Sequence, residues 1–121
     1  MLLSRGKAFG TPLLRIEGDV DPDDAFTLEH AAWEAFGSAG TRIILDLRTC
    51  GHIGSLGLAV LFSLVRWARA KKGSVTAIGP DPALLRLFQI VQLTAEDSFH
   101  IFSDLDGIPH AHRLEGGMPT S

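Results

Sequence analysis

Residues 42–47 (RIILDL) form a nearly unbroken apolar run of strand length. A strand with one face in water alternates apolar and polar side chains, whereas an unbroken run is typical of a strand covered on both faces. We therefore expect this segment to be a central strand of a sheet. Ile44 and Leu45, which point to opposite faces, should both be inaccessible to solvent.

Strand and helix signals alternate along the rest of the chain. Short apolar or β-branched runs of strand type occupy residues 11–17, 74–78 and 99–102, and a weaker run occupies residues 2–4. Parallel strands need a crossover connection, which a helix usually provides. The order therefore predicts an α/β or α+β domain with several parallel strands. Three amphipathic helices are predicted from the apolar stripes Ala25, Leu28, Ala32 and Phe36; Leu58, Leu61, Phe62 and Val65; and Leu84, Leu87, Phe88 and Val91.

Capping signals indicate where these helices begin and end. Asp21 and Pro22 are typical of a helix start, because an aspartate side chain can accept from free backbone N–H groups and proline suits the first helical position. The first helix should end within residues 37–40 and the second at Gly73. The remaining segments are predicted as a turn at residues 48–54, a turn and helix start at residues 79–82, and a final helix at residues 104–114.

Composition limits the number of domains and the classes of partner. A chain of 121 residues, 45% of them hydrophobic, suits one domain; we assign it to residues 1–114 and expect residues 115–121 to be a disordered tail. The net charge of −3 makes nucleic acid and anionic lipid unexpected partners. The single Cys50 excludes an internal disulfide and suits the cytoplasm. Gly57 and Ser63 break the longest apolar stretch, so neither export nor membrane spanning is expected.

No sequence pattern completes a metal site. One acidic cluster consists of Asp19, Asp21, Asp23 and Asp24. A calcium-binding EF-hand counted from Asp19 would need glycine at Asp24 and glutamate at His30, so a turn with a helix cap explains the cluster better. His110 and His112 have no further His or Cys nearby to complete a coordination sphere. We therefore expect no metal and no cofactor.

The loop before the second helix offers weak signals for ligand binding or catalysis. Gly51, Gly54 and Gly57 lie where backbone N–H groups can bind phosphate, but the G-x-G-x-x-G spacing and a following Lys-Ser or Lys-Thr pair are missing. A tight turn with close helix packing is favoured. Cys50 and His52 are close in sequence, yet we expect a buried, inert thiol instead of an activated nucleophile. With no general acid and base to assemble, the chain is not expected to be an enzyme.

Several motifs resemble, in order and spacing, the signature of the STAS domain family. Leu45-Asp46-Leu47, followed after six residues by Gly54-Ser55-Leu56-Gly57-Leu58, resembles the family's LDL strand and its Asp-Ser-Ser-Gly-Leu turn. Gly18-Asp19-Val20-Asp21 resembles the Gly-Glu-Leu-Asp turn before the family's first helix. Gly79-Pro80 and residues 83–88 resemble its Gly-Pro and third-helix segment. The similarity covers residues 11–104.

This resemblance implies both a fold and a function. The implied fold is α/β, a small mixed sheet of four to five strands flanked by helices. The implied function is that of an anti-sigma factor antagonist, in which a serine is phosphorylated by a cognate anti-sigma kinase, and the unphosphorylated form binds that kinase and frees a sigma factor. By position, that serine is Ser55, and the acidic residue of the first turn is Asp21. The partner surface is then expected to include Asp21, Gly54, Ser55, Leu56, Gly57, Ala59 and Val60.

Two departures from the motif keep alternatives open. Gly54 stands in place of the motif aspartate and Leu56 in place of the second serine. The chain can therefore also be a STAS interaction module without phosphorylation, in another signalling complex or a lipid-transport assembly. A small-ligand or nucleotide-binding domain using residues 51–57 is a further alternative. For Ser55 itself, the alternative to phosphorylation is a plain N-cap role, worth about 1 kcal/mol.

Overall fold

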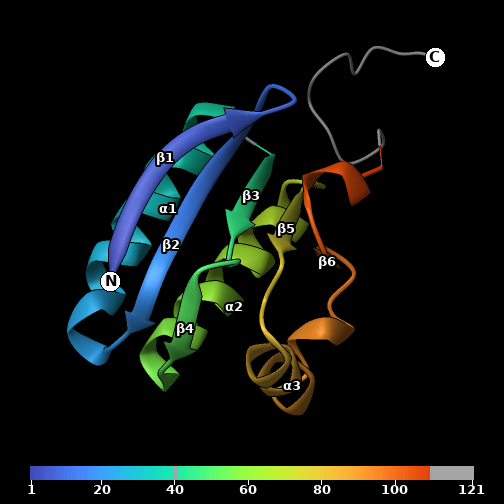
Figure 1. Ribbon diagram of the computed structural model, residues 1–121. Coiled ribbons are helices and arrows are strands. Elements are labelled where there is room, and N and C mark those ends of the chain that lie inside the picture. Colours follow the sequence, from blue (N-terminus) through green and yellow to red (C-terminus); the bar gives the residue numbers. More distant parts are fainter. Residues whose placement is uncertain (40, 110–121) are drawn as a thin grey trace.

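The computed structural model describes residues 1–39 and 41–109 of the chain. Strands and helices alternate along most of this part, as the sequence predicts (Figure 1). Short 3-10 turns lie at the connections: η1 (Pro22–Asp24), η2 (Leu93–Ala95) and η3 (Leu105–Gly107). The main elements are β1 (Leu2–Ala8), β2 (Thr11–Val20), α1 (Ala25–Ala39), β3 (Arg42–Asp46), β4 (Cys50–Ile53), α2 (Ser55–Ala70), β5 (Ser74–Ile78), α3 (Pro82–Ile90) and β6 (Phe99–Phe102).

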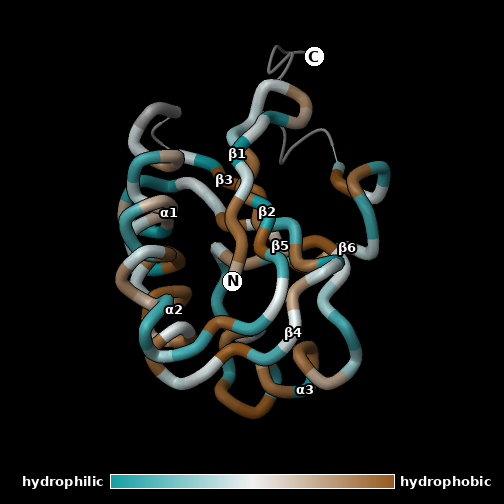
Figure 2. The backbone as a smooth tube through the Cα atoms, turned by 60° about the vertical axis from the view of Figure 1, so that its left-hand side comes forward, coloured by the Kyte–Doolittle hydropathy of each residue, from teal (hydrophilic) through white to brown (hydrophobic). Residues whose placement is uncertain are grey.

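The strands form one mixed six-stranded sheet in the order β1-β2-β3-β5-β6, with β4 paired to β2 beyond the end of β3. β1 and β2 are antiparallel, and all the other pairs are parallel. The helices α1 and α2 lie side by side against one face of the sheet, and α3 lies near its lower end (Figures 1 and 2). The fold is the predicted small mixed α/β sheet flanked by helices, with one strand more than expected.

The main core fills the space between the sheet and the two helices α1 and α2. The predicted stripe of α1 (Ala25, Leu28, Ala32 and Phe36) is buried, as are Leu58, Leu61 and Val65 of α2. Phe62 is only partly buried. Trp67 joins the two helices, because its ring packs edge-on against the rings of Trp33 at 4.6 Å and Phe36 at 4.7 Å. These contacts fix α1 and α2 as one layer.

β3 is covered on both faces, which confirms the prediction from its apolar run. It lies between β2 and β5, and Ile44 and Leu45 are both 0% exposed. Leu45 belongs to the main core under the helices. Ile44 belongs to a second, smaller cluster with Ile78 and Ile108. The smaller cluster lies on the opposite face, because successive side chains of a strand point to opposite sides.

The structure corrects three sequence predictions. The segment predicted as a turn at residues 48–54 contains β4, which pairs in parallel with the last part of β2. The reason is length: β2 has 10 residues and β3 only 5, so the end of β2 needs another partner. β1 is also longer than the predicted residues 2–4. Of the helix predicted at residues 104–114, the described part contains only η3; residues 110–114 and the predicted tail lie outside the described residues.

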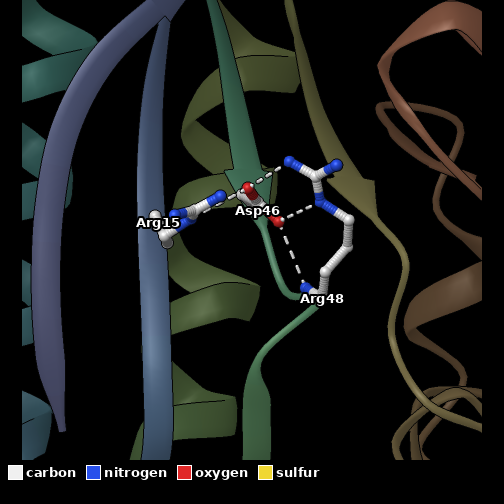
Figure 3. Close-up of polar contacts among 3 residues, drawn as sticks. All are labelled: Arg15, Asp46 and Arg48. Atoms are coloured by element: carbon white, nitrogen blue, oxygen red, sulfur yellow. Dashed lines mark hydrogen bonds and ion pairs between the residues drawn. The ribbon is translucent and has the colours of Figure 1, made fainter.

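A buried carboxylate in β3 is held by two arginines on the face opposite α1 and α2 (Figure 3). Asp46 is 1% exposed. Its Oδ2 accepts from Arg15 Nε at 3.2 Å and from Arg48 Nη2 at 2.8 Å, and its Oδ1 accepts from Arg48 Nε at 3.0 Å and from the Arg48 backbone N–H at 3.2 Å. Burial by itself raises the pKa of Asp46, but the hydrogen bonds from Arg48 and Arg15 outweigh it and lower the pKa. The cluster links β2, β3 and the connection to β4.

The first prediction concerns this cluster. Asp46→Asn should lower the free energy of unfolding at neutral pH by about 1 to 3 kcal/mol. The reason is that a neutral amide replaces a buried carboxylate that accepts hydrogen bonds from two partly exposed arginines. Since the folded-state pKa of Asp46 lies below its ordinary value of 3.8, this contribution is present above pH 3.8 and is lost as the pH falls through the folded-state pKa. Urea unfolding at several pH values measures both effects.

Asp106→Asn is the matched control, because Asp106 is an exposed carboxylate in η3. It should leave the urea midpoint almost unchanged. Equal midpoints for Asp46→Asn and the wild-type protein at neutral pH would show that the negative charge of Asp46 contributes nothing to stability.

Candidate functional site

The candidate site lies where β2 and β4 end and two helical segments begin. β2 leads through Asp21 into η1 and α1, and β4 leads through Gly54 into α2. The backbone N–H of Gly54 donates to the carbonyl of Val20 at 3.0 Å. Because Val20 precedes Asp21 and Gly54 precedes Ser55, this hydrogen bond places the turn that begins at Asp21 beside the start of α2. We call the acidic residues of this turn, Asp21, Asp23 and Asp24, the first-turn acids.

The start of α2 differs by one residue from the prediction. Gly54 is the N-cap, with extended backbone at φ −75° and ψ 175°, and its carbonyl accepts from the Leu58 N–H at 3.0 Å. Ser55 is therefore the first helical residue and not the cap, which corrects the predicted N-cap role. Its side chain is exposed to solvent. A hydroxyl in this position is accessible to a modifying enzyme and lies at the positive end of the helix.

The first turn is more acidic than a helix cap requires. Asp21 precedes the 3-10 turn η1 and not α1 itself. The Asp24 carboxylate accepts from the Asp21 backbone N–H at 2.9 Å, and the Asp24 N–H donates to the Asp21 carbonyl at 2.9 Å. Asp21 and Asp23 are exposed. Asp21 is the N-cap of η1 and Asp24 completes its capping box, and the exposed carboxylates of Asp21 and Asp23 also face solvent.

The predicted partner-binding residues divide into exposed and buried ones. Leu56 is 53% exposed and Ala59 is also exposed. Val60 is only 7% exposed, so little of its side chain is open to solvent. Gly57 is buried, because its Cα faces Val20 and Ile53 and leaves no room for a side chain.

A groove of about 320 Å³ runs between α1 and α2 next to this helix start. Phe26, on its α1 side, is 79% exposed. Phe26 could not be predicted from residue spacing, because only the inward stripe of a helix produces a periodic signal. Its large apolar side chain off that stripe is the signal that the sequence contains. We call the groove between these two helices the α1–α2 groove. It is lined by Pro22, Ala25, Phe26, Glu29, Leu56, Ala59, Val60 and Ser63.

The glycines of the loop have structural reasons. A Cβ on Gly57 would lie 2.8 Å from Ile53 Cγ2 and 2.9 Å from Val20 Cγ1, so glycine lets α2 approach the sheet. A Cβ on Gly51 would collide with the Asp19 carboxylate. Asp19 Oδ1 also accepts from the His52 N–H at 2.8 Å. A carboxylate thus already uses a backbone donor of this loop, which disfavours a phosphate there.

Cys50 fits an inert thiol and not a nucleophile. It is buried, and burial, followed by the negative charges of Asp19 and Asp81, raises its pKa to about 11. The thiol is therefore protonated at neutral pH and unreactive. Within the described residues no three His, Cys, Asp or Glu side chains are placed to hold a metal ion, and no helix is long and apolar enough to cross a membrane. His110 and His112 lie outside the described residues.

Comparison with known proteins agrees with this architecture. The family model described as "Mlab, STAS domain" matches residues 3–101. No curated protein sequence matches the chain.

Solved structures share the fold at low sequence identity. An anti-sigma factor antagonist from Mycobacterium paratuberculosis is 21% identical with a TM-score of 0.75, and the match covers 87% of each chain. SpoIIAA from Bacillus in its phosphorylated form is 17% identical with a TM-score of 0.67, covering 87% of this chain and 95% of SpoIIAA. Unphosphorylated SpoIIAA is 16% identical with a TM-score of 0.67, covering 87% and 92% respectively.

The second prediction tests the close packing at Gly57. Gly57→Ala should lower the free energy of unfolding by about 1 kcal/mol, because overpacking against two stiff β-branched side chains costs about 1 to 3 kcal/mol and the better helix propensity of alanine returns at most about 1 kcal/mol. Gly37→Ala in α1 is the control: a Cβ there meets nothing within 4 Å, so this variant should be stabilised. Thermal unfolding of both variants decides, and a rise in Tm for Gly57→Ala would contradict the packing argument.

Proposed function

The chain belongs to the STAS domain family, and on this premise we propose that it is an anti-sigma factor antagonist. It binds an anti-sigma factor of the serine-kinase type and thereby releases a sigma factor. The surface that does this comprises the first-turn acids and the start of α2, including Asp21, Ser55, Leu56 and Ala59. Phosphorylation of Ser55 switches binding off.

One observation carries this proposal: an exposed serine begins a helix directly beside an exposed leucine. Ser55 and Leu56 occupy the acceptor motif of the family, at the end of the sheet where β2 and β4 finish. The fold is also similar to SpoIIAA in both its phosphorylated and its unphosphorylated form. These likenesses support a serine switch without requiring a change of fold.

The physical chemistry of Ser55 explains how such a switch works. A phosphate adds a charge of roughly −1.5 to −2. The positive end of α2 tolerates this charge, so the domain stays folded. A partner that covers Leu56 with apolar surface has to remove water from the phosphate, which is costly, so binding weakens.

In this function the chain acts as a binding protein and not as an enzyme. Its partner is a protein, with no nucleic acid, membrane, metal or cofactor involved. Since sigma factors act on RNA polymerase in the cytoplasm, the proposal places the chain there.

A second candidate function is a STAS interaction module that is never phosphorylated. Gly54 in place of the motif aspartate and Leu56 in place of the second serine favour it. The matching family model, described as that of an Mlab STAS domain, does not name an anti-sigma function. The nucleotide-binding alternative is less favoured, because the Asp19 carboxylate occupies the loop.

The third prediction tests the partner surface. Leu56→Glu should abolish binding to the cognate anti-sigma factor while leaving the circular dichroism spectrum unchanged, because Leu56 is largely exposed and makes little contribution to the core. Ile90→Glu is the matched control, since Ile90 is 69% exposed on α3. A charge at Val60, in contrast, should unfold the domain and is not informative. Unchanged binding of Leu56→Glu would place the interface elsewhere.

The fourth prediction tests the switch. Incubation with the cognate kinase and ATP should add one phosphate to the parent protein, and Ser55→Ala should add none, as measured by intact mass. Ser55→Asp should bind the partner more weakly but only modestly so, since a carboxylate carries less charge than a phosphate.

Gly54→Asp restores the acidic residue of the motif and is the positive control for the kinase reaction. The site has room for it, because the nearest atom to a Cβ at Gly54 is the Val20 carbonyl oxygen at 3.5 Å. If neither the parent protein nor Gly54→Asp acquires phosphate, the switch is abandoned and the second candidate function is adopted.

A further inference from the structure

We infer that the α1–α2 groove binds an amphipathic helix of the partner, with its basic end over η1 and an apolar side chain between Phe26 and Leu56. The inference rests on the proposed function and names the chemistry of the partner segment. It assigns a binding role to Phe26, which no motif indicates.

The groove offers an apolar surface that the fold itself does not use. Phe26 and Leu56, two of the largest exposed apolar side chains of the described residues, face it from opposite walls. Pro22, Ala25, Ala59 and Val60 complete the apolar lining. Exposed apolar surface gathered in one concave place is typical of an interaction site, whereas single exposed apolar residues are ordinary. Leu2 and Ile90 are such single residues.

The walls of the groove offer a ligand no free backbone groups for pairing. Both walls are helices, whose backbone groups are used within α1 and α2. An extended peptide binds by adding a strand to a free sheet edge, and the groove has none. A helical segment satisfies its own backbone and presents apolar side chains at positions i, i+3, i+4 and i+7. The geometry therefore favours a helix over a strand added to a sheet edge.

The charge around the groove selects a basic segment. Pro22 of η1 lines one end of the groove; Asp23 and Asp24 follow it in η1 and Asp21 precedes it, while Glu29 lines the α1 wall. Among the ion pairs of the described residues, none involves these four carboxylates.

Cations lie at the opposite end of α2 and fix the orientation of the bound segment. Arg66 lies over the Phe62 ring at 6.0 Å, and Lys71 lies over the Trp67 ring at 5.2 Å. A bound helix with lysines or arginines at one end is attracted by η1 and repelled by this other end of α2. Its basic end is therefore placed over η1.

The carboxylates around the groove and its apolar side chains should affect different rate constants of partner binding. Exposed charges steer the encounter and change the association rate, whereas buried apolar contacts set the dissociation rate. Asp23→Asn combined with Glu29→Gln should therefore slow association and weaken its salt dependence. Phe26→Ala should mainly speed dissociation.

The fifth prediction uses two synthetic peptides as probes. Both are helical with leucines at i, i+3, i+4 and i+7; one carries lysines at one end and the other carries glutamates there. The lysine peptide should bind at least about tenfold more tightly at low salt, and the difference should shrink as salt rises. Phe26→Ala should weaken the lysine peptide by about tenfold, while Leu2→Ala, a matched exposed apolar residue on β1, should not.

Chemical shifts of the labelled protein locate the peptide. Shifts confined to the facing sides of α1 and α2 support the inference. Equal affinity for the two peptides, equal binding by wild-type and Phe26→Ala proteins, or shifts elsewhere would overturn it. If the cognate partner loses binding to Leu56→Glu but not to Phe26→Ala, the proposed function stands and the groove inference falls. If the lysine peptide binds the groove but no anti-sigma kinase binds the protein, the preference of the groove for a basic helix stands and the proposed function falls.

Discussion

Burial of β3 on both faces is the constraint from which the rest of the domain follows. Its neighbours β2 and β5 run parallel to it, so each connection has to cross the sheet, and α1 and α2 make these crossings. Crossovers of one hand that proceed in one direction along a sheet bring their helices to the same face, which is where Figure 1 shows α1 and α2. Parallel strands also end at one edge of the sheet. The segments η1, α2 and α3 all start there, and the candidate site lies at that edge for this reason.

The same strand carries a carboxylate, which a buried strand accepts only at a cost. Asp46 offsets this cost with donors from two sides, Arg15 of β2 and Arg48 of the following turn. Arg15 of β2 and Asp46 of β3 are paired positions in the sheet, so their hydrogen bond fixes how β2 and β3 lie relative to each other. Arrangements that separate the strands would leave this buried charge without its partners, which is costly, so they are disfavoured. The aspartate of the LDL motif therefore has a structural role apart from the binding surface.

The parts of the fold that could be predicted from sequence are those with a local signal. The β3 run, the α1 stripe and the strands β5 and β6 follow from the spacing of apolar residues, and the motif spacing was sufficient to place Ser55 at a helix start. β4 could not be predicted, because Cys50–Ile53 has no strand pattern of its own and pairs only because β2 extends beyond β3. The exposures of Val60 and Phe26 could not be predicted for one reason: which side of a helix faces the core depends on how α1 and α2 pack together, and residue spacing near a helix end leaves this undetermined.

The overlap between β2 and β4 has a consequence for the motions of the domain. Beyond β3, the last residues of β2 are held on that side by only four residues of β4, of which Cys50 and Ile53 are buried and His52 is exposed. Short pairings at a sheet end open at lower free energy than central strands. Because the Gly54 N–H to Val20 carbonyl bond joins the two segments, opening of β4 releases the first-turn acids and the start of α2 together. The binding surface should therefore exchange its amide hydrogens as one cooperative unit, earlier than β3, and a bound partner should slow exchange in both halves at once.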